Sequence, residues 1–416
     1  MVSDEAQVVV LGAGLVGICT ALALCEHGHP VTLIDRDEPG QGASMGNAGV
    51  IASMSCVPQS VPGLLRKVPG WLLDPEGPVA LRLAYAPRML PWLGRFLAAG
   101  SERRLPPIAD AMLALNRPNL ELYKALVADT PAAGLVRDAY YVFVSRDEAD
   151  LNTQALMWRL RAERGVPFER IDGAALRELE PDISPDYQGA VIIGAHGRVT
   201  DPGRLGQVLA QKASMQGVRV LRGQVSALRA EGDAGWRLDM DTGPMRARSV
   251  VLTAGVWSAR LLESLRVRTP LEAERGYHLM FADPGVSLRH SVHDISGKVV
   301  LSSMDMGVRC AGTAEFAGID AAPDYRRARI FKTLARRLLP SLNTAQTVEW
   351  MGRRPATPDS LPYIGPVPGY HQLYAGFGHG HLGLTGAPHT ARLLAALVDG
   401  RDPGIDLTPF RLDRFS

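Results

Sequence analysis

The chain has 416 residues, of which 46% are apolar and 21% are charged, with 45 Lys and Arg against 43 Asp and Glu. This length exceeds what one hydrophobic core usually serves, so we expect two domains. The near-balanced charge argues against a nucleic-acid partner, which normally requires a basic surface. The four cysteines form no CxxC pair, and the N-terminus lacks the basic start of a signal peptide. We therefore expect buried thiols and a cytoplasmic protein.

The first expected elements are a strand, a helix and a second strand. Residues 8–11 form a short β-branched run, a helical pattern follows to about residue 27, and residues 29–35 read as another strand. The stretch 8–25 is apolar enough to mimic a membrane span. Its three glycines stand at a phosphate-binding spacing, however, and a buried strand followed by a buried helix gives the same hydropathy. We predict a βαβ unit.

The remaining elements follow from periodicity and turn residues. Helices are expected over residues 79–97, 108–129, 148–164 and 324–339. Strands are expected over residues 139–145, 218–223, 247–257 and, as an alternating series, 271–314. Composite units are expected as a strand, turn and helix over 191–216, a hairpin over 225–243, and a strand, loop and helix over 373–400.

The first glycine cluster has the pattern of a dinucleotide-binding loop. Gly12, Gly14 and Gly17 form G-x-G-x-x-G between a strand and a helix. The first glycine permits a tight turn, the second lets the backbone approach a pyrophosphate, and the third lets the helix pack on the strand. Asp35 ends the second strand at about the 20-residue separation at which an acid binds a ribose hydroxyl. This acid suits FAD and NAD equally.

The next motif favours FAD. Residues 40–52, "GQGASMGNAGVIA", combine small residues with Ser44 and Asn47 directly after the second strand. The backbone can approach a ligand closely here a second time. A simple NAD-binding fold would show more alternating sheet at this place.

Six stretches together resemble the FAD-dependent D-amino-acid oxidase superfamily, and within it the bacterial D-amino-acid dehydrogenases. They are "VVVLGAGLVGICTALALCEHGHPVTLID", "GASMGNAGVIA", "GRVTDPGRL", "VVLTAGVWSARL", "EWMGRRPATPDSLPYIGP" and "LYAGFGHGHLGLTGAPHTARLLA". They run from residue 8 to about residue 398. Each stretch alone is common, but their combination in this order is specific.

The resemblance implies an α/β fold with a discontinuous Rossmann-like FAD-binding domain. An inserted α+β substrate domain would contain a mostly antiparallel sheet. We predict the FAD-binding domain over residues 1–60, 195–265 and 345–416, and the substrate-binding domain over residues 61–194 and 266–344.

The resemblance also implies non-covalent FAD, because the covalent histidine of some relatives would fall near Ser44 and Met45 and is absent. The loop 378–385, "GHGHLGLT", would direct backbone N–H groups at a helix N-terminus toward the N1/O2 side of the flavin ring. The predicted cofactor contacts are Gly12, Gly14, Leu15, Val16, Gly17, Asp35, Arg36, Ser44, Asn47, Ala48, Gly49, Val225, Ala254, Gly255, Trp257, Gly380, His381, Gly383, Leu384 and Thr385.

Three residues are predicted to act on the substrate. In "WMGRRP", Arg354 matches the family's arginine that binds the substrate carboxylate, a task suited to its planar two-donor guanidinium. In "RGYHL", Tyr277 and His278 match a stretch above the active site, and strand alternation lets one of them reach it. Whether Arg353 and His379 contact substrate or flavin stays open. His379 and His381 have no carboxylate or cysteine at ligand spacing, so no metal is predicted.

The implied reaction is oxidative deamination of a D-amino acid, with hydride transfer from Cα–H to flavin N5 and electrons passed to a quinone or another acceptor. The alternatives are a glycine/sarcosine-type oxidase using O2, or one subunit of a D-hydroxyproline or opine dehydrogenase. A flavin-bearing RNA-modifying module is a more distant alternative, which the charge balance disfavours. The preferred side chain and the oligomeric state, homo- or hetero-oligomer included, stay open.

The segment 61–97 interleaves Trp, Leu and Arg, as a membrane-surface element does. An ordinary helix over the substrate domain explains the same pattern. Peripheral contact with the inner face of the membrane is therefore an alternative to a purely cytoplasmic location.

Overall fold

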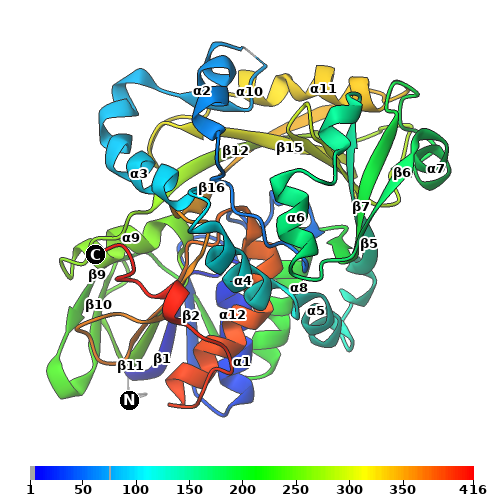
Figure 1. Cartoon of the computed structure of the whole chain (residues 1–416). Coiled ribbons are helices and arrows are strands. Elements are labelled where there is room, and N and C mark those ends of the chain that lie inside the picture. The colour runs from blue at the N-terminus through cyan, green and yellow to red at the C-terminus, as the bar shows by residue number, and fades with distance from the viewer. Residues whose placement is uncertain (1–4, 75) are drawn as a thin grey trace.

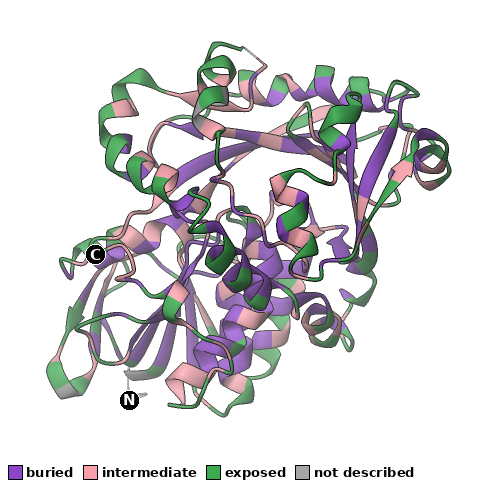
Figure 2. Cartoon of the chain, in the orientation of Figure 1, coloured by how far each residue is buried: buried purple, intermediate pink, exposed green. Residues whose placement is uncertain are grey.

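The computed structural model describes residues 5–74 and 76–416, and two β-sheets organise it (Figure 1). Sheet A occupies the lower part of the view and sheet B the upper part, and helices cover both. Buried residues concentrate along the strands of the two sheets and in the helices beneath them (Figure 2). The predicted fold class, a Rossmann-like unit with a second, mostly antiparallel sheet, is confirmed.

Sheet A has the strand order β17-β18-β11-β1-β2-β8, with the hairpin β9-β10 attached to β11. Its parallel strands are β1 (Glu5–Leu11), β2 (Val31–Asp35), β8 (Arg219–Arg222), β11 (Met245–Leu252) and β18 (Leu373–Phe377). The antiparallel additions are β17 (Tyr363–Pro366), β9 (Val225–Ala230) and β10 (Trp236–Met240). Strands distant in sequence thus pair directly, as a discontinuous nucleotide-binding unit requires.

Three helices cover one face of sheet A. They are α1 (Leu15–Glu26), α8 (Pro202–Met215) and α12 (Gly383–Val398). Helix α1 is apolar around most of its circumference, and its residues from Leu15 to Leu24 are almost all buried. It packs between α12 and α8. The first and last helical segments of the chain are therefore neighbours.

Sheet B has the strand order β16-β12-β15-β14-β13-β5-β7-β3, with β4 paired to β15 and β6 to β7. Its strands are β16 (Thr347–Ala356), β12 (Glu272–Phe281), β15 (Gly307–Phe316), β14 (Val299–Met304), β13 (Ser291–Asp294), β5 (Val136–Ser145), β7 (Gly189–Val199), β3 (Val50–Ile51), β4 (Val79–Leu81) and β6 (Phe168–Asp172). All pairs are antiparallel except β13 with β5 and β15 with β4.

Helices pack around sheet B. The amphipathic helix α11 (Phe331–Leu338) buries Phe331, Leu334, Ala335 and Leu338 against it, at i, i+3, i+4 and i+7. The other helices are α2 (Leu64–Leu73), α3 (Ala86–Ala99), α4 (Leu105–Asn116), α5 (Asn119–Val127), α6 (Leu156–Ala162), α7 (Gly173–Leu179) and α10 (Arg326–Arg329). Helix α9 (Ser258–Glu263) packs on β9 of sheet A instead. Within the described residues, no helix is long and apolar enough to span a bilayer.

All four predicted helices differ from the structure, and the range 324–339 contains two helices, α10 and α11. The range 79–97 begins as strand β4, because residues 79–81 pair with Ala314–Phe316, and only α3 is an α-helix. The range 108–129 is divided at Pro118 into α4 and α5. The range 148–164 contains a short 3-10 turn and then α6.

The predicted domain boundaries cut across sheet B. The boundary at residue 345 assigns β16 to the FAD-binding part, yet β16 is an edge strand of sheet B beside β12. Residues 50–51 likewise pair with β7 in sheet B. At β3 and at β16 the chain passes between sheet A and sheet B, and the candidate site lies at this junction.

Candidate functional site

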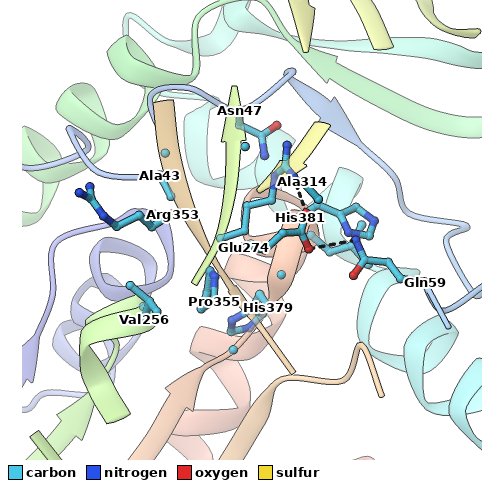
Figure 3. Close-up of a pocket in the computed structure, with 18 of the residues that line it drawn as sticks. Ala43, Asn47, Gln59, Val256, Glu274, Ala314, Arg353, Pro355, His379 and His381 are labelled. Carbon is cyan, nitrogen blue, oxygen red and sulfur yellow. Dashed lines mark hydrogen bonds and ion pairs between the residues drawn. The ribbon is translucent and has the colours of Figure 1, made fainter. Parts of the chain in front are cut away.

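A large cavity of about 1370 Å³ lies where the two sheets meet. It is lined by the glycine loop after β1, by residues 42–48, by the loop after β18, and by β12, β13, β15 and β16 of sheet B. The two glycine-rich loops from opposite ends of the sequence therefore face one space. Figure 3 shows part of its wall.

Two glycines shape the first loop. Gly12 has φ +107°, and a Cβ there would lie 2.6 Å from the Cα of Ala254. At Gly17 a Cβ would overlap the carbonyl oxygen of Gly12. Neither position tolerates a side chain, because the strand, the turn and helix α1 are in direct backbone contact.

Asp35 closes the same end of the cavity from β2. Its carboxylate accepts hydrogen bonds from the Ala13 N–H at 2.6 Å and the Asp37 N–H at 3.0 Å. Burial raises the pKa of Asp35, and these two N–H groups act against that rise. Ser44 accepts a hydrogen bond from the Leu15 N–H at 3.0 Å, directly at the N-terminus of α1.

Cationic and aromatic side chains border the cavity beyond Asp35. The Arg36 guanidinium lies 3.8 Å from the centre of the Trp257 ring, and Arg353 lies 5.9 Å from it. The Nε of Arg353 donates to the Ile319 carbonyl at 2.6 Å. In Figure 3 Arg353 extends away from Glu274, on the Val256 side. Its side chain therefore belongs to this end of the cavity.

The C-terminal loop meets sheet B from below. Gly378 and Gly380 have φ of +89° and +53°, and α12 begins at Gly383. His379 is buried, and its Nε2 lies 2.9 Å from the Thr390 hydroxyl oxygen. Burial lowers the pKa of His379 to about 3 and also lowers the pKa of His381. Both imidazoles are therefore neutral at neutral pH.

Arg354 reaches the cavity from β16 across the neighbouring strand. Its Nη1 pairs with the Glu274 carboxylate and donates to the Thr313 carbonyl at 3.0 Å, and its Nη2 donates to the Gly312 carbonyl at 3.3 Å. Gly276 of β12 lies beneath the guanidinium, where any Cβ would overlap it. The absent side chain thus opens the path of Arg354 over β12.

This arrangement places a glycine-rich loop, the acid at the end of β2 and an anchored guanidinium around one cavity. The family model described as FAD-dependent oxidoreductase (DAO) matches residues 7–397. The chain belongs to this family. Bound FAD is accordingly its cofactor, and the protein is an FAD-dependent oxidoreductase.

Curated relatives match over nearly their whole length. A D-amino-acid oxidase of Bradyrhizobium diazoefficiens is 37% identical, with 98% of this chain and 99% of the relative covered. A D-amino acid dehydrogenase of Vibrio cholerae is 34% identical, with 96% and 98% covered.

Solved structures share the fold of the DAO family member described here. Glycine oxidase from Geobacillus kaustophilus superposes with a TM-score of 0.75 at 22% identity, covering 99% of both chains. L-proline dehydrogenase from P. horikoshii gives 0.77 at 18% identity, covering 100% of this chain and 98% of that one. At these identities the likeness concerns the fold.

The cavity fits FAD by its shape and its groups. Its volume exceeds the roughly 300–1,000 Å³ of an ordinary ligand pocket, which leaves space for cofactor and substrate together. The predicted cofactor contacts that line it are Gly12, Gly14, Leu15, Val16, Asp35, Arg36, Ser44, Asn47, Ala48, Val225, Ala254, Gly255, Trp257, Gly380, His381, Gly383 and Leu384.

Three predicted cofactor contacts lie behind the cavity wall. Gly17 packs α1 against β1, as described above. Gly49 has φ +75° and donates its N–H to Asn47 Oδ1 at 2.9 Å, so it shapes the loop. The Thr385 hydroxyl accepts from the Ala52 N–H at 3.0 Å and donates to the Val50 carbonyl at 3.2 Å. All three position residues that do line the cavity.

The predicted catalytic role of His278 finds no support in its position. Its side chain does not line the cavity: the ring stacks on Trp350 with centroids 4.9 Å apart, and its Nδ1 lies 3.1 Å from the Gly46 carbonyl. Burial lowers its pKa to about 3. His278 thus supports the wall formed by Trp350 and the 42–48 loop.

Tyr277 borders the cavity, but its hydroxyl is already paired elsewhere. The hydroxyl donates to Glu315 Oε2 at 2.6 Å and accepts from the Asp324 N–H at 2.9 Å. Its ring belongs to the hydrophobic cluster beneath α11. Strand alternation explains this: Tyr277 faces α11, whereas Glu274 and Gly276 face Arg354.

Sequence reasoning missed Glu274 and Gln59. Glu274 is 5% exposed, and Gln59 Nε2 donates to its Oε2 at 3.4 Å. Figure 3 shows Glu274, His381 and Gln59 together in the wall. The sequence did contain one signal for Glu274, because an acidic residue stands three positions before Tyr277 in a predicted strand with alternating residues. Within the described part of the chain, no group of three His, Cys, Asp or Glu could hold a metal ion.

Proposed function

We propose that the protein oxidatively deaminates a D-amino acid, giving an imino acid that hydrolyses to a 2-oxo acid. The curated relatives carry the names D-amino-acid oxidase and D-amino acid dehydrogenase. The observation that carries the proposal is the position of the Arg354 guanidinium, in the cavity wall that also contains the C-terminal glycine loop.

Arg354 is the proposed carboxylate-binding group. A guanidinium keeps its charge and presents a planar pair of donors that fixes a carboxylate in orientation. Glu274 and the carbonyls of Gly312 and Thr313 restrict its rotation. The substrate's Cα is then held at one place in the cavity, and such positioning is the main contribution of the protein in this chemistry.

Glu274 is the proposed partner of the substrate amine. A D-amino acid carries one carboxylate and one ammonium, and the Arg354–Glu274 pair offers one group of each complementary charge. The amine must be neutral when the Cα–H bond breaks, and Glu274 would then accept a hydrogen bond from it.

The proposed cofactor contacts divide between the two loops. The first loop and Asp35 would hold the pyrophosphate and ribose, and the N–H groups around Gly380–Leu384 would stabilise negative charge on the flavin ring; all of these residues line the cavity. Bound FAD supplies a two-electron acceptor for the hydride that leaves Cα. The neutral His379 and His381 keep this end of the cavity free of extra cationic charge.

The proposal is tested by anaerobic bleaching of the bound flavin with a panel of D- and L-amino acids. Arg354→Ala should lower kcat/KM for the best D-amino acid by at least tenfold. Arg246→Ala is the matched control, since Arg246 is an exposed arginine paired with Glu231 on sheet A. An Arg354→Ala enzyme as active as the control would overturn the assignment.

The electron acceptor is proposed to be a quinone or another carrier. The competing possibilities are a glycine/sarcosine-type oxidase, which would turn over with O2 alone, and a subunit of a hetero-oligomeric dehydrogenase, which would co-purify with a second chain. Turnover measured with O2 and then with an artificial acceptor separates the first. Mass measurement of the purified complex separates the second and gives the oligomeric state.

Peripheral membrane contact is proposed for the α2–α3 region. Leu73, Leu83 and Leu90 expose 84%, 86% and 63% of their surface here, as apolar side chains at a membrane interface do. Flotation with anionic vesicles should recover the wild-type protein in the lipid fraction and lose a Leu73→Ser, Leu83→Ser, Leu90→Ser variant. Protein that stays entirely unbound to vesicles overturns this part.

A further inference from the structure

The cavity has a second polar region, which lies on the same face of sheet B as Arg354 but three strands further along the sheet. It is formed by Tyr141 and Phe143 of β5, Arg161 of α6, and His293 of β13, all of which line the cavity. The rings of Tyr141 and Phe143 lie 6.0 and 5.1 Å from that of His293. We call these four residues the distal region.

Arg161 is a cation without an acidic partner among the described residues. Its Nη1 donates to the Met157 carbonyl one turn earlier, at 3.1 Å. Its guanidinium lies 4.6 Å from the Trp158 ring centre and 5.5 Å from that of Phe143. Its Nε is buried and makes no hydrogen bond within the described structure. A guanidinium remains charged in proteins, so a buried one normally pairs with an anion.

The polar side chains of the distal region beside Arg161 are a hydroxyl and an imidazole, and neither is an acid. The Tyr141 hydroxyl lies 3.4 Å from Nδ1 of His293. Burial, together with the positive charges of Lys298 and Arg161, lowers the pKa of His293 to about 3, so its ring is neutral. Lys298 also lines the cavity. The distal region thus combines positive potential with a hydroxyl and an imidazole able to donate hydrogen bonds.

The spacing between Arg354 and the distal region follows from the sheet. The Arg354 guanidinium lies at the carbonyls of β15, and Arg161 packs on Phe143 of β5, three strands away in the order β15-β14-β13-β5. Neighbouring strands are about 4.8 Å apart, so the two guanidinium groups are separated by roughly 14 Å. The carboxylates of an extended five-carbon amino diacid are about 5 Å apart, and each bidentate contact adds about 4 Å. The two lengths agree.

We propose that the distal region binds a carboxylate on the substrate's side chain, so that the preferred D-amino acid is acidic and of the length of D-glutamate. This inference rests on the proposed function, with Arg354 on the α-carboxylate. Arg161 is then a specificity-determining residue, and Tyr141 and His293 add neutral hydrogen bonds beside it.

The test compares D-glutamate with D-glutamine, which has the same shape and lacks the charge. For the FAD-loaded wild type we expect kcat/KM at least tenfold higher for D-glutamate, because one hydrogen bond to a charged group contributes at least that factor. Arg161→Gln should reduce the D-glutamate to D-glutamine ratio at least tenfold, mainly through KM. Arg161→Lys should retain part of the ratio. Arg159→Gln, an exposed arginine of the same helix, is the control and should leave it unchanged.

A second measurement does not depend on turnover. Glutarate should perturb the flavin absorbance with a Kd at least tenfold below that of pentanoate, and Arg161→Gln should bring the two Kd values together. Equal kcat/KM for D-glutamate and D-glutamine in the wild type, with equal Kd values for the two acids, would overturn the inference. If no D-amino acid bleaches the flavin while glutarate still binds through Arg161, the proposed function is wrong and the anion site stands.

Discussion

Arg354 and Glu274 form an ion pair between neighbouring strands of sheet B, in register on β16 and β12. The Glu274 side chain is 5% exposed and the Arg354 side chain 23%, so both form part of the cavity wall and have little contact with bulk water. Removing one member of a largely buried pair leaves an uncompensated charge, which costs more than the loss of a surface pair. The pair therefore fixes the geometry of the guanidinium that we propose binds the substrate carboxylate.

Glu274→Gln should impair catalysis. The amide keeps the shape but removes the counter-charge that orients Arg354 and the proposed acceptor for the substrate amine. We expect kcat/KM to fall at least tenfold, and kcat to fall as well as KM to rise. Steady-state kinetics with the best D-amino acid checks this.

The control for that variant is Glu349→Gln on the same strand as Arg354. Glu349 pairs with Arg329, which is 67% exposed, and exposed pairs contribute about 0–1 kcal/mol. Its kinetics should match wild type. If Glu274→Gln also matches wild type, Glu274 has no part in the reaction.

Gly276→Ala should displace the Arg354 guanidinium without unfolding the strand. A Cβ at this position overlaps the end of the Arg354 side chain, which can move, and not backbone. We expect at least a tenfold rise in KM with Tm within a few degrees of wild type. Gly194→Ala on β7 is the matched control, because nothing lies within 4 Å of its added Cβ. Unchanged KM in Gly276→Ala would show that Arg354 does not need its present position.

Local chemistry explains why the cofactor end could be predicted from the sequence. A tight turn and two close backbone approaches each require glycine, so the glycines recur at a fixed spacing in the sequence. The βαβ unit then places an acid at the end of the next strand. Gly12, Gly14 and Asp35 therefore carry their function within 30 residues of sequence.

The substrate end could not be predicted in the same way, because sheet pairing assembles it from distant strands. Glu274 of β12, Gln59 of a loop and Arg161 of α6 belong to no local motif, and only the tertiary fold brings them to one cavity. Tertiary pairing also determined the secondary structure of Val79–Leu81. This segment has helical periodicity in the sequence but pairs with β15 as a strand. Tyr277 and His278 matched a family stretch, but their own contacts direct them to α11 and Trp350.

Gly12→Ala should abolish FAD binding. The residue needs φ +107°, and the added Cβ would lie 2.6 Å from the backbone of Ala254, where neither atom can move freely. We expect purified protein with little yellow colour and a Kd for FAD raised by more than tenfold, by absorbance and fluorescence titration. Gly94→Ala in α3 is the control, since its added Cβ has open space. A Gly12→Ala protein with full FAD content would remove the first loop from the cofactor site.

His379 should make stability fall at acidic pH. Its pKa is about 3 in the folded protein and about 6.5 when unfolded, so the folded state binds fewer protons. Stability from the neutral ring is fully present above pH 6.5 and is lost as pH falls toward 3, by up to about 1.4 kcal/mol per pH unit. His379→Gln, which keeps a hydrogen-bonding group near Thr390 and cannot titrate, should show a smaller loss of Tm between pH 6.5 and 4.5. His371→Gln, an exposed histidine, should follow the wild-type slope, and a His379→Gln slope equal to both would show that protonation of this buried ring is not what acid acts on.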